Sequence, residues 1–110
     1  MARFGLLAQR GGVWDGAQLT TETWFDEAWT AIAQNPEYGL LWWLLGEGRR
    51  GGSKGPQDWV AALGAQDQKI YVVPSLDLVV ARQGLAAEKV TEAGSSFDVT
   101  LGAAIMRARA

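Results

Sequence analysis

Residues 69–73 and 76–82 form two apolar segments that only a short turn at Pro74 separates. β-Branched and aromatic side chains dominate both segments, and such side chains are typical of strands. Proline favours a tight turn and cannot continue a central strand, because it lacks a backbone N–H. The pattern therefore predicts two consecutive strands that pair antiparallel, since so short a connection leaves no room for a crossover.

The rest of the sheet is predicted from two further segments. We interpret residues 59–73 as one long strand that is interrupted near Gly64. In residues 38–45 both sets of alternate positions are apolar, so this segment is predicted to be a strand that is covered on both faces. With the strand at residues 76–82, these segments predict a meandering antiparallel sheet of about three strands.

Three helices are expected around this sheet. The first covers residues 2–8 and ends near Gly11, since glycine readily adopts the left-handed conformation that closes a helix. The second is predicted to begin after an N-cap at Thr20 and to stop before Pro36. The third follows a cap at Ser96 and runs to the end of the chain.

The sequence predicts a single α+β domain over residues 1–110, with the C-terminal helix packed on one face of the sheet and the N-terminal helices nearby. A hairpin turn is expected at Asp15-Gly16, because this pair suits the positive φ angles of such turns. The apolar stripe of the C-terminal helix has a helical spacing. Its members are Phe97, Leu101, Ile105 and Ala108.

Composition excludes several classes of function. The chain has no cysteine and no histidine, which removes thiol chemistry, the usual zinc ligands and every Ser-His-Asp arrangement, and we expect no cofactor and no metal. Its formal charge is −2 and its basic residues form no long run, so no nucleic-acid partner is expected. No apolar run approaches the ~20 residues of a membrane helix, and no signal peptide is recognisable. A soluble protein, located in the cytoplasm, is the expectation.

Three short motifs together resemble a known family. They are Met-Ala-Arg-Phe-Gly-Leu-Leu in residues 1–7, Tyr-Gly-Leu-Leu-Trp-Trp in residues 38–43, and Ile-Tyr-Val-Val-Pro-Ser-Leu-Asp-Leu-Val-Val-Ala-Arg in residues 70–82. With the apolar strands around them, they resemble the C-terminal portion of the β-lactamase-related serine hydrolases, which include class C β-lactamases and penicillin-binding-protein-like esterases. In that family the sheet has further strands from the chain's beginning, and a helical domain with the nucleophile follows them. The resemblance implies that this chain corresponds to the part after both.

The catalytic motifs of that family are missing. The family uses a Ser-x-x-Lys pair as nucleophile and activating amine, together with a Tyr-x-Asn element. Neither Tyr38 nor Tyr71 is followed two residues later by asparagine. No serine is followed three residues later by lysine; the four serines are Ser53, Ser75, Ser95 and Ser96. No catalytic residue is therefore assigned to this chain.

The family's third motif, which lies on a strand beside the nucleophile, has a counterpart at Leu63-Gly64-Ala65. The resemblance implies that the backbone N–H just after it, here that of Gln66, would complete an oxyanion hole. Leu63 occupies the first motif position and can neither carry a charge nor donate a hydrogen bond. The alternative interpretation is that this region is only a polar bulge or turn that breaks a strand.

Six tryptophans are many for a chain of 110 residues. Trp42, Trp43 and Trp59 are candidates for lining a ligand groove or an interface, although tryptophan in a strand is more often part of the core.

Three hypotheses of function follow. The first is a truncated β-lactamase-like fragment that has no hydrolase activity of its own and forms a homodimer, in which Trp42 or Trp43 contributes to the contact. The second is one half of a split serine hydrolase, whose partner chain supplies Ser-x-x-Lys. The third is a small-ligand binding module that uses an exposed aromatic surface.

Overall fold

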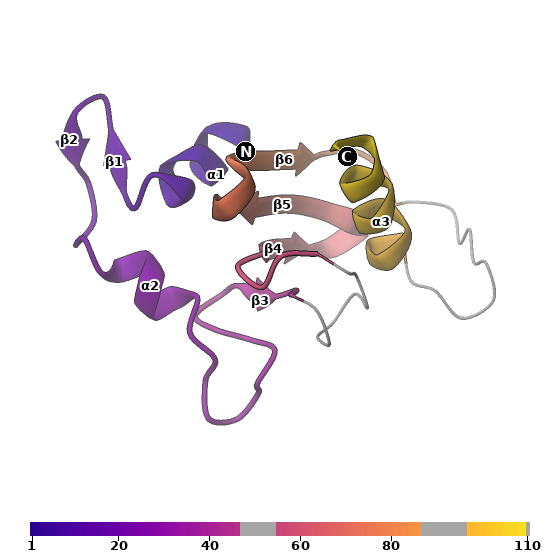
Figure 1. The fold of residues 1–110 in the computed structure, drawn as a ribbon, viewed down its shortest axis with the longest axis horizontal. Coiled ribbons are helices and arrows are strands. Elements are labelled where there is room, and N and C mark those ends of the chain that lie inside the picture. Colours follow the sequence, from indigo (N-terminus) through magenta and orange to yellow (C-terminus); the bar gives the residue numbers. More distant parts are fainter. Residues whose placement is uncertain (47–54, 87–96, 110) are drawn as a thin grey trace.

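The computed structural model describes residues 1–46, 55–86 and 97–109. It is an α+β fold with a four-stranded antiparallel sheet in the order β3-β4-β5-β6 and a separate two-stranded hairpin, β1-β2 (Figure 1). The predicted fold class is therefore confirmed, but the main sheet has four strands and not three.

The central part of the sheet is a meander of β4 (Val60–Gly64), β5 (Gln68–Val73) and β6 (Leu78–Arg82). The 3₁₀ turns η1 (Ala65–Asp67) and η2 (Pro74–Leu76) join the consecutive strands. The turn at Pro74 is thus confirmed, whereas the single long strand over residues 59–73 is wrong. Gln66 and Asp67 have φ angles of 58° and 63°, so the chain reverses there and β5 pairs with β4 instead of extending it.

Residues 38–45 are mostly a tight reversal and not the predicted strand. Only β3 (Trp43–Leu44) is a strand, and Tyr38 pairs with Trp43 in an isolated bridge. Between them the N–H of Gly39 donates to the carbonyl oxygen of Trp42 at 2.8 Å. Leu41 adopts φ 66° at the tip of this turn, which places its side chain in solvent. The strand that the apolar pattern predicted over residues 38–45 is therefore wrong, except at Trp43 and Leu44.

The N-terminal elements are α1 (Ala2–Gln9), β1 (Val13–Trp14), β2 (Ala17–Gln18) and α2 (Trp24–Ala28). The predicted first helix is confirmed, and Asp15 and Gly16 form the hairpin turn with φ 48° and 75°. The second helix is shorter than predicted. Its N-cap is Thr23 and not Thr20, and it ends well before Pro36.

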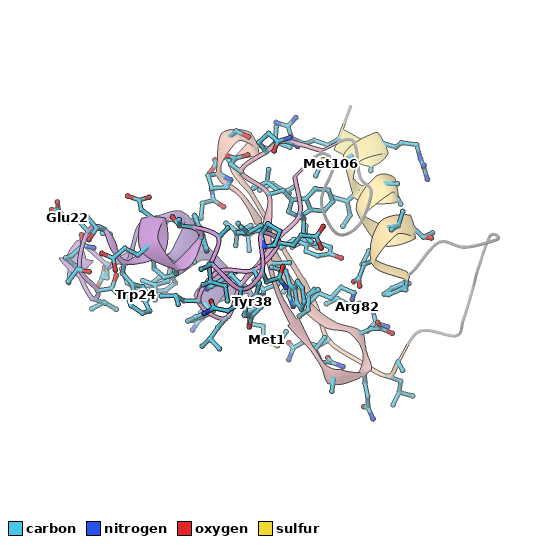
Figure 2. All side chains as sticks on the ribbon, turned by 90° about the horizontal axis from the view of Figure 1, so that it is seen from below. Met1, Glu22, Trp24, Tyr38, Arg82 and Met106 are labelled. Carbon is cyan, nitrogen blue, oxygen red and sulfur yellow. The ribbon has the colours of Figure 1, made fainter. Side chains whose placement is uncertain are left out.

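Two apolar clusters cover opposite faces of the sheet. The N-terminal helices cover one face with Ala8, Phe25 and Ala28 over Val60 and Val72. Figure 2, in which the sheet is seen nearly edge-on, shows α3 (Phe97–Arg109) on the other side. The sheet is therefore the middle layer of three, in agreement with the α+β prediction.

Helix α3 lies close to the sheet because it presents a glycine to a large ring. A Cβ atom at Gly102 would lie 2.6 Å from Cη2 of Trp59, which is buried. Leu101 and Ile105 pack in the same cluster, as their spacing predicted, whereas Ala108 is exposed. The predicted cap Ser96 lies outside the described residues.

Candidate functional site

The counterpart of the family's strand motif forms the end of β4 and the turn that follows it. Leu63 and Gly64 are the last two residues of β4, and Ala65 and Gln66 begin η1. The side-chain amide of Gln68 donates to the carbonyl oxygen of Gln66 at 3.0 Å, so the turn is held to the start of β5. The polar-turn interpretation of this region agrees with the geometry, since these residues connect two paired strands.

A hollow of about 250 Å³ opens beside this turn. Its walls are mainly apolar, and Leu41, at 82% exposure, projects from the rim. The lining residues are Met1, Leu41, Ala62, Leu63, Gly64, Gln68 and Ile70. No lining side chain carries a carboxylate, an amine, a hydroxyl or a thiol, so the hollow can hold a small apolar group and its side chains offer no nucleophile or general base.

An ionic cluster that the sequence analysis missed lies on the opposite face, under α3. The Lys69 side chain is 3% exposed; its ammonium group forms a short contact with Asp98 of α3 and lies 3.5 Å from an oxygen of Asp67. The hydroxyl of Tyr71 donates to Asp98 at 3.5 Å. Burial, followed by the negative charge of Asp98, raises the pKa of Tyr71 well above its ordinary value.

Aromatic contacts extend this cluster to the edge of the sheet. The Phe97 ring centroid is 5.3 Å from Nζ of Lys69 and 5.1 Å from the guanidinium carbon of Arg82. Arg82 also donates to the carbonyl oxygen of Asp67 at 2.9 Å. These contacts fasten the first turn of α3 to the β4–β5 turn, and the buried Lys69 amine is occupied by its carboxylate partners Asp98 and Asp67. We therefore assign this cluster to stability and not to catalysis.

The only sequence signal for the cluster was a single lysine in an apolar strand. Lys69 precedes four apolar residues of β5, where an unpaired charge would be costly. Its partner Asp98 lies 29 residues further along the chain, so sequence spacing alone could not identify the pair.

Ser75 is the serine that the described residues contain, and its surroundings are those of a turn. Its hydroxyl donates to one oxygen of Asp58 at 2.8 Å, and its backbone N–H donates to the other at 2.6 Å. Lys69 is near the start of β5, whereas Ser75 lies in η2 after the end of that strand, and the strand from Lys69 to Val73 alone spans roughly 13 Å. Ser53, Ser95 and Ser96 lie outside the described residues.

The candidate aromatic residues belong to the chain's own core. Trp42 and Trp59 are buried, and Trp43 is half-buried with its ring centroid 4.8 Å from that of Tyr38. Trp42 packs edge-on to Trp29 at 5.8 Å. The core interpretation of these tryptophans agrees with their burial, and Trp42 and Trp59 offer no exposed face to a ligand or a second chain.

β6 is the longer of the two strands at the edges of the main sheet (Figure 1). Five of the six residues of β5 are buried, whereas no residue of β6 is. β6 has only one polar residue and β5 has two, Gln68 and Lys69, so the lower burial of β6 follows from its position at the edge of the sheet and not from a more polar sequence.

Comparisons of this chain with models of protein families, with curated proteins and with solved structures find no match. Within residues 1–46, 55–86 and 97–109, no group of three or more acidic, histidine or cysteine side chains is placed to hold a metal ion. None of the helices in the described ranges has both the length and the apolar character that crossing a membrane requires.

Proposed function

We propose that this chain is a β-lactamase-like fragment that has no hydrolase activity of its own and associates with a second copy of itself. The observation that carries the proposal is the apolar edge strand β6. A strand that is apolar on both faces is typical of the interior of a sheet, yet among the strands that the structure describes β6 pairs with β5 alone. A sheet that continues across this edge would complete its backbone hydrogen bonds.

The lack of activity is supported by the absence of the required chemistry. The sequence has no Ser-x-x-Lys pair and no histidine. Ser75 is bound to Asp58 within a turn, and Lys69 is bound to Asp98. Backbone N–H groups without a nucleophile give at most a small residual rate.

Both parts of the proposal are tested on the same preparation. The purified chain and its Ser75→Ala variant are incubated with a chromogenic cephalosporin and with a nitrophenyl ester. We expect both to match the rate of an inert protein at equal concentration, while light scattering reports a dimer. Saturable turnover by the parent chain that Ser75→Ala abolishes would contradict the proposal, as would a monomeric mass.

The hollow beside Leu63 and Gly64 favours a second function, half of a split serine hydrolase. It is open at the position that the resemblance assigns to the strand motif, and it would be covered by a chain that supplies Ser-x-x-Lys and Tyr-x-Asn. The test is to mix the two chains. Turnover that requires both, and that the serine of the added chain controls, would support this function over the first.

A further inference from the structure

The edge strand β6 lacks the features that protect exposed edges from pairing. Native edges are commonly blocked by proline, by outward lysine, by a bulge or by a covering segment. β6 has the sequence Leu-Val-Val-Ala-Arg, and its register with β5 is continuous over all five residues. Its one charged residue, Arg82, donates to carbonyl oxygens of Asp67 and Leu85 in its own chain. Within residues 1–46, 55–86 and 97–109, no strand pairs with the outer edge of β6.

We infer that β6 pairs antiparallel with β6 of a second copy, about a two-fold axis that passes beside Val80. This inference rests on the proposed function and specifies its interface. Val80 is the middle residue of β6, so this register pairs all five residues and sets Leu78 opposite Arg82 of the partner subunit. The result is a continuous sheet of eight strands, twice the four of each chain.

The charges of the strand favour this arrangement over a parallel one. Two-fold symmetry places the two Arg82 side chains at opposite ends of the interface, whereas an in-register parallel pair would set them side by side. Like charges directly opposite one another destabilise a strand pair. Two-fold symmetry is the most frequent symmetry of homo-oligomers. Two copies of β6 can pair in this way without bringing their Arg82 side chains together.

Both faces of the sheet continue across the proposed interface. Opposed residues in an antiparallel pair lie on the same face. Leu78 and Val80 belong to the cluster under α3, and Val79 belongs to the cluster under the N-terminal helices. Each cluster would therefore meet its own copy, which extends the apolar layers on both sides.

A hollow near the start of β6 and an exposed leucine beyond its end lie toward one another in this register. The hollow has a volume of about 410 Å³ and both apolar and polar lining residues, which are Leu6, Gln9, Arg10, Pro74, Asp77 and Val79. Leu85 is 85% exposed just beyond the end of the strand. Because the two strands run in opposite directions, the partner's Leu85 lies toward this hollow.

Cysteine cross-linking tests the register, since the natural chain has no cysteine. Val80→Cys places two thiols across the axis, where antiparallel Cα atoms are about 4.5–5.5 Å apart, within the range that a disulfide spans. Leu78→Cys is the matched control, because its Cα atoms would be about 14 Å apart along the paired strands. Ala104→Cys, on the exposed face of α3, reports random collisions.

Under mild oxidation Val80→Cys should become a covalent dimer, while Leu78→Cys and Ala104→Cys remain single chains on a non-reducing gel. Equal cross-linking of all three variants would overturn the register. If the parent chain is a dimer but Val80→Cys does not cross-link, the interface is wrong and the proposed self-association stands. A monomeric parent chain would refute both.

Hydrogen exchange on the unmodified chain gives a second measurement that needs no substitution. The backbone amides of β6 that point outward should be protected at high protein concentration and should lose protection on dilution, while the protection of β5 is unchanged. Exchange in β6 that does not depend on concentration would overturn the inference.

Discussion

Replacing Lys69 by methionine tests the ionic cluster under α3. The substitution keeps the aliphatic length of the side chain and removes the ammonium group, so that Asp98 and Asp67 lose their buried counterion. Removing one partner of a buried pair costs about 3–5 kcal/mol, because the other charge is left uncompensated. Asp98 is 18% exposed and Asp67 is 29% exposed, so water relieves part of this penalty. We therefore expect a loss of about 3 kcal/mol, at the low end of that range.

The assay is urea denaturation of the parent chain, Lys69→Met and the double variant Lys69→Met/Asp98→Leu. Small domains have total stabilities of about 5–15 kcal/mol, so the single variant should unfold at a much lower urea concentration. The double variant should recover part of the loss, since an apolar pair can replace a buried ion pair at little cost. Arg107→Met, on an exposed residue of the same helix, is the control. A single variant that lies within about 0.5 kcal/mol of the parent, as surface changes do, would refute the assignment.

Three further predictions concern the same face of the sheet. Because the pKa of Tyr71 is raised in the folded state, its phenol stays protonated at a pH where the phenol of the unfolded chain has ionised. The free energy of unfolding should therefore fall as the pH rises above about 10. Tyr71→Phe should abolish this fall, which alkaline denaturation measures. Gly102→Val should lower stability by about 2 kcal/mol, since overpacking against Trp59 outweighs any backbone benefit; an unchanged melting temperature would show that α3 can move away. Leu101→Ala should cost about 2 kcal/mol in urea, the low end for a half-buried leucine, and no change would mean that α3 is not docked.

Local signals predicted those elements whose ends are marked by turn chemistry. The turn at Pro74 lies between β5 and β6 as expected, and Asp15 and Gly16 close the first hairpin. Helix α1 ends where a glycine follows it. In each case one or two residues restrict the backbone dihedral angles so strongly that they determine the turn without contacts from the rest of the fold.

Elements inferred from apolar periodicity alone were predicted less well. Residues 38–45 alternate like a strand, but the chain reverses at Leu41, whose positive φ no propensity rule anticipates. The predicted long strand at residues 59–73 is folded in half at Gln66 and Asp67 for the same reason. Apolar patterns show which residues are buried, and they do not show where the chain turns back on itself.

The role that the resemblance implies for the strand-motif counterpart stays a prediction. Leu63 and Gly64 line an open hollow that the sequence did not indicate, and Trp42 and Trp59 are buried, as the core interpretation expected. The sequence analysis expected a dimer in which Trp42 or Trp43 contributes to the contact. Because Trp42 is buried within its own chain, we now propose that the dimer contact is formed by β6. The position of β6 at the edge depends on the order of strands in the sheet, which local sequence does not indicate.

The molar mass of the unmodified chain in solution tests the central proposal most directly. Size exclusion coupled to light scattering, over a dilution series in the micromolar range, should give twice the 11.9 kDa of the single chain at the higher concentrations. A mass of 11.9 kDa at every concentration would mean that the edge of β6 stays unpaired and that the chain is self-sufficient as a monomer.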